Sequence, residues 1–169
     1  MSKKASQFKL VLQVDVGNRL AWLVLVLLFF LPDGNATFSN DIRIVGKVVG
    51  VTDSDTIRVL MDRRPVKVRL SCIDTEKRQP YDSRAKQALS DLVSGWMAAV
   101  DVKTTDRYGR TVGRAYWDGL DVNAEMVRRG AAWVYRKFCR DASLLELEAQ
   151  ARTERWGLWG LPEAQRVLP

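Results

Sequence analysis

The chain has 169 residues, carries a formal net charge of +7 at pH 7 and is 47% hydrophobic. This length and apolar content suffice for one globular domain with a core, and the basic surplus favours anionic partners, either nucleic acid or anionic membrane. The chain contains no histidine, which excludes Ser-His-Asp and Cys-His nucleophile systems, histidine general bases and histidine-ligated zinc. Hydrolytic chemistry would then depend on carboxylates, arginines, water and an oxygen-preferring cation.

The first 36 residues are predicted to lie outside the folded domain. An uninterrupted apolar run starts at Leu20 and ends at Leu31, with basic residues before it and Pro32-Asp33-Gly34 after it. As a helix it would cover about 18 Å, less than a ~30 Å hydrocarbon core. We therefore interpret residues 1–36 as a signal peptide cleaved after Ala36, which implies a secreted or periplasmic protein. The alternatives are an uncleaved membrane anchor with the domain facing outside, and a buried helix.

A meander of three antiparallel strands is predicted after the leader. The β-rich runs are residues 45–52, 56–61 and 66–73, and the third alternates apolar Val66, Val68 and Leu70 with polar positions. A turn is expected at residues 62–65, where the sequence is Asp-Arg-Arg-Pro.

The remainder of the chain alternates between helical and strand patterns. A helix is expected from Ser83 to Gly95, followed by strands at 98–103 and 111–117 that a polar loop joins. A short helix is expected at 123–129. The last helix is expected to begin with the capping box Ser143-Leu144-Leu145-Glu146 and to stop at Gly157. Five short strands with intervening helices predict a mainly β protein with α, namely a five-stranded OB-type barrel with three packed helices. The domain is expected to span residues 40–160, with a tail at 161–169.

The two cysteines, Cys72 and Cys139, are neither a disulfide framework nor spaced as a zinc site. They could pair in an oxidising compartment if their Cα atoms lay close enough. We interpret them instead as two buried thiols, because Cys72 stands in an apolar, strand-like run where cysteine behaves as a small hydrophobic residue.

Acidic residues gather where the predicted strands end. Asp53 and Asp55 flank Ser54 between the first two strands, and Asp74 follows the third. Because the second and third strands pair through a short turn, the start of one lies beside the end of the other, and Asp55 and Asp74 should be neighbours. Carboxylates with a backbone carbonyl and waters are ligands that Ca²⁺ or Mg²⁺ takes. Taken alone, Asp-Ser-Asp would more often be an ordinary tight turn.

Two arginines and one glutamate complete a possible phosphodiesterase site. Arg69 stands five residues before Asp74, and Arg110 ends a polar loop that begins at Asp106. The N–H groups of their guanidinium ends can donate to the oxygens of a phosphodiester and stabilise the charge of a pentacoordinate phosphorus. Glu76, the acid just beyond the acidic cluster, could orient or deprotonate the attacking water. Each arginine taken singly could equally be a surface residue.

In sum, residues 45–159 resemble the staphylococcal nuclease (thermonuclease) family. The matching signals are Asp53-x-Asp55-Thr56, Val68-Arg69-Leu70, Ile73-Asp74-Thr75, Pro80-Tyr81, Asp106-Arg107-Tyr108-Gly109-Arg110, Val122-Asn123, Gly130-Ala131-Ala132-Trp133 and Gly157-Leu158-Trp159. No single motif is decisive, but their order and spacing together are highly specific.

The resemblance implies an OB-type barrel with three helices and a Ca²⁺-dependent endonuclease that cuts DNA and RNA to 3′-phosphate products. By its motifs, Asp55 and Asp74 would be carboxylate ligands of calcium, and Thr75 would give a backbone oxygen. Arg69 and Arg110 would bind the phosphate, Glu76 would be the general base, and Tyr135 would stack on a nucleotide. A monomer with no protein partner is expected, apart from a possible membrane tether through the apolar run.

The chain departs from the family pattern beside the expected base. The family reads Asp-Thr-Pro-Glu or Asp-Ala-Pro-Glu, whereas this chain reads Asp74-Thr75-Glu76, one proline short. Losing one extended residue shifts the backbone by up to ~3.3–3.6 Å and reverses side-chain direction. Ser54 and Asp82 also stand where the family has glycine. The alternative function is therefore a catalytically weak or inactive OB-fold module that binds nucleic acid or a nucleotide.

Overall fold

The structure, a computed structural model, describes residues 42–75 and 81–163. The predicted leader at 1–36, the apolar run that ends at Leu31, Glu76 and the last part of the predicted tail lie outside the described residues. Within the two described ranges, no helix combines the length and the hydropathy needed to span a membrane.

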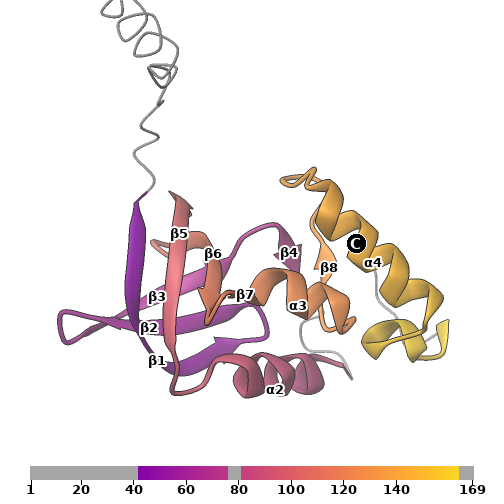
Figure 1. The fold of residues 1–169 in the computed structure, drawn as a ribbon, viewed down its shortest axis with the longest axis horizontal. Coiled ribbons are helices and arrows are strands. Elements are labelled where there is room, and N and C mark those ends of the chain that lie inside the picture. The colour runs from indigo at the N-terminus through magenta and orange to yellow at the C-terminus, as the bar shows by residue number, and fades with distance from the viewer. Residues whose placement is uncertain (1–41, 76–80, 164–169) are drawn as a thin grey trace, which may run out of the picture. The chain divides into compact units, whose positions relative to one another are not determined.

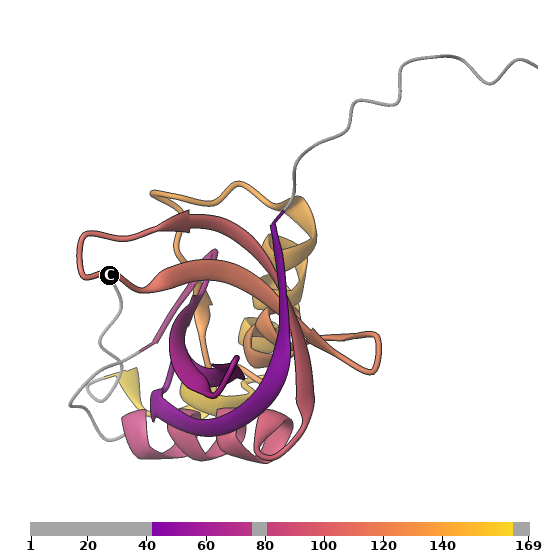
Figure 2. The same ribbon diagram turned by 90° about the vertical axis from the view of Figure 1, so that its left-hand side faces the viewer.

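Five strands form a closed barrel, as Figures 1 and 2 show. They are β1 (Arg43–Asp53), β2 (Thr56–Met61), β3 (Arg64–Leu70), β5 (Met97–Thr105) and β6 (Thr111–Trp117). The hydrogen-bonded order is β3-β2-β1-β5-β6, with antiparallel neighbours, and a parallel pairing of β3 with β6 closes the ring. Closure leaves these strands no open edge within the ring.

The barrel interior is filled by alternate residues of each strand, because successive strand side chains point to opposite faces. In β1, Ile44 and Val48 are buried whereas Val45 and Lys47 are exposed. Irregular register between Val48 and Asp53 marks the second half of β1, and such bulges bend a strand and increase its twist. The period-2 pattern in the sequence therefore predicts the core face correctly.

Two glycines allow the strands to approach closely inside the small ring. A Cβ atom on Gly46 would lie 2.2 Å from the Leu60 carbonyl oxygen, and one on Gly113 would lie 2.6 Å from a Val100 methyl carbon. Neither distance is compatible with a side chain, so close backbone contact explains both residues.

Three helices accompany the barrel and confirm the predicted fold class. They are α2 (Asp82–Val93), α3 (Val122–Arg128) and α4 (Ala142–Thr153), followed by the 3₁₀ turn η1 (Gly157–Gly160). The helix α2 lies along the lower side of the barrel in Figures 1 and 2, and α3 lies beside α4 in Figure 1. Short strands complete the fold: β4 (Ile73–Asp74) pairs with β8 (Trp133–Val134), and β7 (Leu120–Asp121) pairs with β6.

The third predicted strand is interrupted, and this interruption shapes the site. The strand β3 ends at Leu70, the chain turns at Ser71 and Cys72, and it resumes as β4. Cys72 has φ 65°, a left-handed conformation that no strand adopts. The buried Asn123 of α3 supports the turn: its amide nitrogen donates to the Ser71 carbonyl (2.7 Å) and its oxygen accepts from the Ala115 backbone N–H (3.0 Å).

The prediction that Ser143 caps the last helix is wrong, because the cap lies two residues earlier in the chain. The N-cap of α4 is Asp141, whose carboxylate accepts hydrogen bonds from the backbone N–H (3.0 Å) and the hydroxyl (2.6 Å) of Ser143. An aspartate satisfies the free N–H groups of a first helical turn as well as serine does. Ser143 therefore lies inside the helix as a donor to the cap.

The two cysteines form a disulfide, so their interpretation as buried thiols is wrong. Their Cα atoms are 5.0 Å apart, within the usual range for such a bond. The bond joins the turn after β3 to the loop before α4. The sequence reading failed because it placed Cys72 inside a strand, whereas the left-handed turn brings this residue to the loop that carries Cys139.

Breaking this disulfide should lower the stability of the fold. The bond closes a loop with a sequence separation of 67 residues, and its loss is expected to reduce the free energy of unfolding by roughly 2–4 kcal/mol. Urea unfolding with and without reductant measures the effect. The Cys72→Ala/Cys139→Ala variant is the control and should not respond to reductant. An unchanged midpoint after complete reduction, verified by thiol titration, would contradict the expectation.

Candidate functional site

The site begins with a fully buried carboxylate at the β1–β2 turn. Asp55 has no exposed surface, and its Oδ1 accepts a hydrogen bond from the Thr56 hydroxyl (2.7 Å). Its backbone oxygen accepts from the Leu70 N–H (2.9 Å), which ties the turn to the end of β3. A charge in such a position requires compensation by an opposite charge and hydrogen bonds. By contrast, Asp53 is exposed at the end of β1.

Arg69 supplies the opposite charge and contacts two carboxylates at once. The register of β2 with β3 places Arg69 opposite Thr56, next to Asp55. One terminal nitrogen lies 3.1 Å from Asp55 Oδ2, and the other lies 3.0 Å from Asp74 Oδ1. A longer hydrogen bond (3.4 Å) runs to the carbonyl of Ile73. The predicted proximity of Asp55 and Asp74 is thus present, with one guanidinium bridging them.

A second arginine is held by the loop that precedes β6. Asp106 Oδ1 accepts from the backbone N–H groups of Tyr108 and Arg110 (2.9 Å each), and Oδ2 accepts from Arg110 Nε (2.7 Å). Partial burial would raise the pKa of the Asp106 carboxyl, but these hydrogen bonds and the charge of Arg110 lower it overall. An ionised Asp106 therefore both folds the loop and orients Arg110. Sequence reasoning included Asp106 in the motif without this role.

Three polar side chains join the β1–β2 turn to both ends of the segment that contains Glu76. Ser54 Oγ lies 2.7 Å from Thr75 Oγ1 and donates to Asp82 Oδ1 (2.8 Å). Ser54 and Thr75 are buried, and neither Ser54 nor Asp82 has a positive φ. The two residues that replace glycines of the family pattern are therefore unstrained and hydrogen-bonded to each other.

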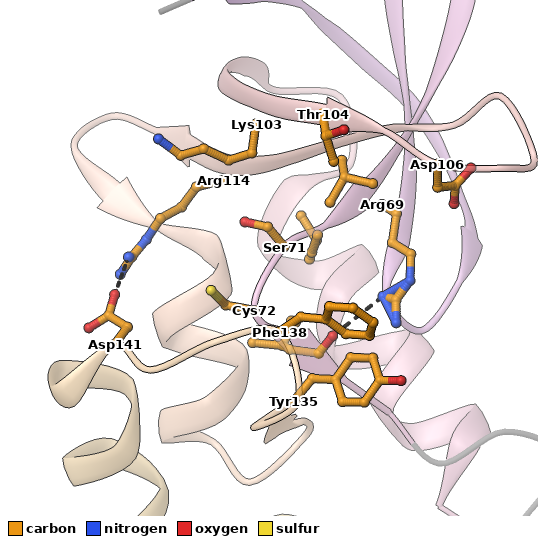
Figure 3. A pocket seen from close by; sticks show the side chains of 13 residues that line it. Arg69, Ser71, Cys72, Lys103, Thr104, Asp106, Arg114, Tyr135, Phe138 and Asp141 are labelled. Carbon is orange, nitrogen blue, oxygen red and sulfur yellow. Dashed lines mark hydrogen bonds and ion pairs between the residues drawn. The ribbon is translucent and has the colours of Figure 1, made fainter. Parts of the chain in front are cut away.

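A pocket of about 670 Å³ opens beside these groups, and Figure 3 shows its walls. Arg69 and Asp106 lie at one end, and Lys103 lies with the Arg114–Asp141 ion pair at the other. Tyr135 lines the pocket near Arg69 in Figure 3 and is half-buried, with its backbone N–H bonded to the Cys72 carbonyl (2.9 Å).

Phe138 also lines the pocket, next to Tyr135, and sequence reasoning missed it. It missed Lys103, Arg114 and Asp141 as well, because each lies in a different element with no motif to connect them. The signal that could have indicated Phe138 is its neighbour Cys139, the disulfide partner of Cys72.

The fit of a hard cation can be judged from the oxygen donors. Among residues 42–75 and 81–163, no group of three or more acidic, histidine or cysteine side chains is arranged to hold a metal. Asp55 and Asp74 are nevertheless close enough to share one guanidinium, and Thr75 follows Asp74 directly. Two carboxylates plus a backbone oxygen fit part of a calcium shell, whose remaining ligands can be waters.

The comparisons with known proteins agree with this architecture. The family model described as staphylococcal nuclease homologue matches residues 67–160. The protein ParB of Escherichia coli is 47% identical over 132 residues, which cover 70% of this chain and 74% of that protein. A micrococcal nuclease of Shigella flexneri is 43% identical over 71% of this chain and 76% of its own length. An uncharacterized endonuclease of Escherichia coli O157:H7 is 44% identical, with 73% and 81% covered.

The closed OB-type barrel carries two arginines and two carboxylates beside a pocket, an arrangement suited to binding a phosphodiester. Together with the matching family model and relatives, it shows that the chain belongs to the staphylococcal nuclease family. The chain is accordingly a nuclease of this family.

The ion pair at the far end of the pocket should make stability depend on acidic pH. Hydrogen bonds from Ser143 and the charge of Arg114 lower the pKa of Asp141 from 3.8 to about 2. Because the folded-state pKa lies below the unfolded one, the stabilisation is present above about pH 3.8 and is lost as the pH falls towards 2.

The variant Asp141→Asn keeps a capping oxygen but carries no charge. Between pH 5 and pH 2.5 the stability advantage of the wild type over this variant should shrink by on the order of 1 kcal/mol, a value reduced for solvent screening of a partly exposed group. Urea unfolding at several pH values gives the comparison, and Glu146→Gln, an exposed position on the same helix, controls for removal of a charge. A difference that stays constant with pH would refute the assignment.

Proposed function

We propose that this protein is a calcium-dependent endonuclease that hydrolyses phosphodiester bonds of DNA and RNA and leaves 3′-phosphate products. The observation that carries the proposal is the contact of Arg69 with both Asp55 and Asp74 at the end of a pocket that also contains Asp106, the residue that orients Arg110. Histidine chemistry is excluded by composition, so charge and positioning have to carry the reaction.

Arg69 and Arg110 are proposed to bind the scissile phosphate. Both side chains are only about one-fifth exposed or less, so their contacts are weakly screened by solvent. Each is oriented before substrate arrives, Arg69 by its two carboxylates and Arg110 by Asp106. Pre-oriented forked donors stabilise the additional negative charge of a pentacoordinate phosphorus more effectively than mobile ones.

Asp55, Asp74 and the backbone oxygen of Thr75 are proposed to hold calcium. Calcium bound there would polarise a phosphate oxygen and neutralise developing charge. The chain's own contribution is the buried Asp55 beside the partly exposed Asp74, with Asp55 fixed by Thr56 and Thr75 fixed by Ser54.

Glu76 is proposed as the general base that takes a proton from the attacking water. This residue lies outside the described residues; its place shortly after Asp74-Thr75 supports the role, and the missing proline of the family pattern is the reason to test it. The adjacent Thr75 is buried and hydrogen-bonded to Ser54. Tyr135, on the pocket wall, is proposed to stack on the base of the bound nucleotide.

We also propose that the protein acts outside the cytoplasm, as a secreted or periplasmic enzyme. The disulfide between Cys72 and Cys139 supports this location, because such bonds persist in oxidising compartments and are rare in the cytosol. The leader-like sequence of residues 1–36 supports it too, and the same residues leave a membrane-anchored form facing outside as the alternative.

The second candidate function is a nucleic-acid-binding module of low or no activity. It is favoured by the missing residue before Glu76, since a misplacement of about 1 Å can cost a hundredfold in rate. The arginines and the pocket would serve binding in either case.

Cleavage should require calcium. The purified protein is expected to degrade single-stranded DNA and RNA with added Ca²⁺, to stop with chelator, and to yield fragments that carry a 3′-phosphate, as end-group analysis of the products can determine. Chelated protein restored with Ca²⁺ is the control for irreversible damage. Retained binding of nucleic acid without cleavage above a buffer blank would favour the module over the enzyme.

Each phosphate-binding arginine should be essential for turnover. Arg69→Ala and Arg110→Ala are each expected to lower kcat/KM by about 10²- to 10³-fold, since each removes a charge-assisted contact in the transition state. The matched control is Arg64→Ala, an exposed arginine on the same strand as Arg69. Circular dichroism must accompany Arg69→Ala because that change leaves the buried Asp55 without this ion pair. A wild-type rate in either variant would disprove the role of that residue.

A further inference from the structure

Phe138 is an exposed aromatic side chain on the wall of the pocket. Its relative exposure is 70%, the highest among the exposed large hydrophobic residues of the described part of the chain. Single exposed hydrophobic residues are common on protein surfaces, so exposure alone indicates nothing. Figure 3 shows, however, that its ring lies next to Tyr135 and on the same side of the pocket as the Arg69 guanidinium.

The backbone around Phe138 is fixed at several points. Its N–H donates to the Tyr135 carbonyl (2.9 Å), the Tyr135 N–H donates to the Cys72 carbonyl (2.9 Å), and the next residue, Cys139, is bonded to Cys72. The loop that carries an exposed ring is therefore anchored to the turn that precedes Asp74. Anchoring of this kind reduces the entropy lost when a ligand binds against the ring.

The ring itself is arranged to receive a further flat group. Phe138 meets Tyr135 edge to face, with centroids 4.9 Å apart and planes at 71°, so the two rings present faces in different directions. Lys137 Nζ lies 5.6 Å from the Phe138 centroid. A positive charge therefore stands beside the ring, and the exposed Lys103 lines the other end of the pocket.

We propose that Phe138 forms a second base-stacking site, which binds the nucleotide adjacent to the one at Tyr135 and selects single-stranded nucleic acid. The proposal rests on the proposed function, because it assumes that Tyr135 and Arg69 receive a nucleotide. Every base has a π-face and can stack on an aromatic side chain regardless of sequence. Bases inside a duplex have both faces covered by their neighbours, so only an unpaired strand can use the site.

The proposal predicts that Phe138 matters for an oligonucleotide and not for a single nucleotide. Binding is measured with the full chain in the presence of chelator, so that neither calcium nor turnover affects the result. The probes are thymidine 3′,5′-bisphosphate and a 5′-phosphorylated tetrathymidylate. Phe138→Ala is expected to weaken binding of the tetramer by about 5- to 100-fold, the range for loss of one stacked base, and to change the Kd of the bisphosphate less than twofold.

Two further variants sharpen the test. Phe138→Trp should bind the tetramer at least as tightly as the wild type, because a larger ring stacks at least as well. Met97→Ala, an exposed apolar position on β5 outside the pocket lining, is the matched control and should leave both constants unchanged. Phe138→Ala should also leave the affinity for a long, blunt-ended duplex unchanged.

An equal loss of affinity for both single-stranded probes, or no loss for either, would overturn the proposal. These outcomes are separable from the fate of the proposed function. If the wild type cleaves nucleic acid with calcium but Phe138→Ala shows no length-dependent loss, the second stacking site is wrong and the nuclease proposal stands. If the length-dependent loss appears in a protein that cleaves nothing, the stacking site stands and the catalytic proposal fails.

Discussion

The contact of Arg69 with two carboxylates is the interaction on which the site depends. Asp55 is fully buried, and burial of a carboxylate is tolerated only with a compensating charge close by. Arg69 can compensate it because the β2–β3 register sets Thr56 opposite Arg69. A slip of one residue would turn the guanidinium to the other face of the sheet and leave Asp55 without that ion pair. The register of β2 with β3 therefore also determines whether the buried charge of Asp55 is compensated.

Much of this arrangement follows from the sequence by local rules. Alternation of apolar residues gives the barrel strands, and pairing of two consecutive strands brings Asp55 near Asp74. The local rules fail where a distant contact decides the conformation. Cys72 takes a left-handed φ that its own residue type does not favour, and Asn123 and the bond to Cys139 hold it there. The helix start at Asp141 is likewise stabilised by Arg114, which belongs to the distant strand β6.

Sequence reasoning supplied Arg69 and Tyr135 of the pocket wall but not Phe138. An exposed phenylalanine in a loop shows no periodicity, and its position depends on a disulfide whose partner is remote in sequence. The hydrogen bonds around Ser54 were also unpredicted: Ser54 and Asp82 stand where the family has glycine, and the structure gives neither residue a positive φ and joins the two by a hydrogen bond. The departures from the family pattern at Ser54 and Asp82 are explained by the hydrogen bond between the two side chains.

Because Ser54 and Asp82 share a hydrogen bond, a substitution at either position affects the contacts of the other. Glycine at 54 would remove the hydroxyl that contacts Asp82 and Thr75 at once, while glycine at 82 would leave the buried Ser54 with one partner fewer. Contacting residues have non-additive effects on stability. The effect on stability of a change at position 54 is therefore expected to depend on which residue stands at position 82.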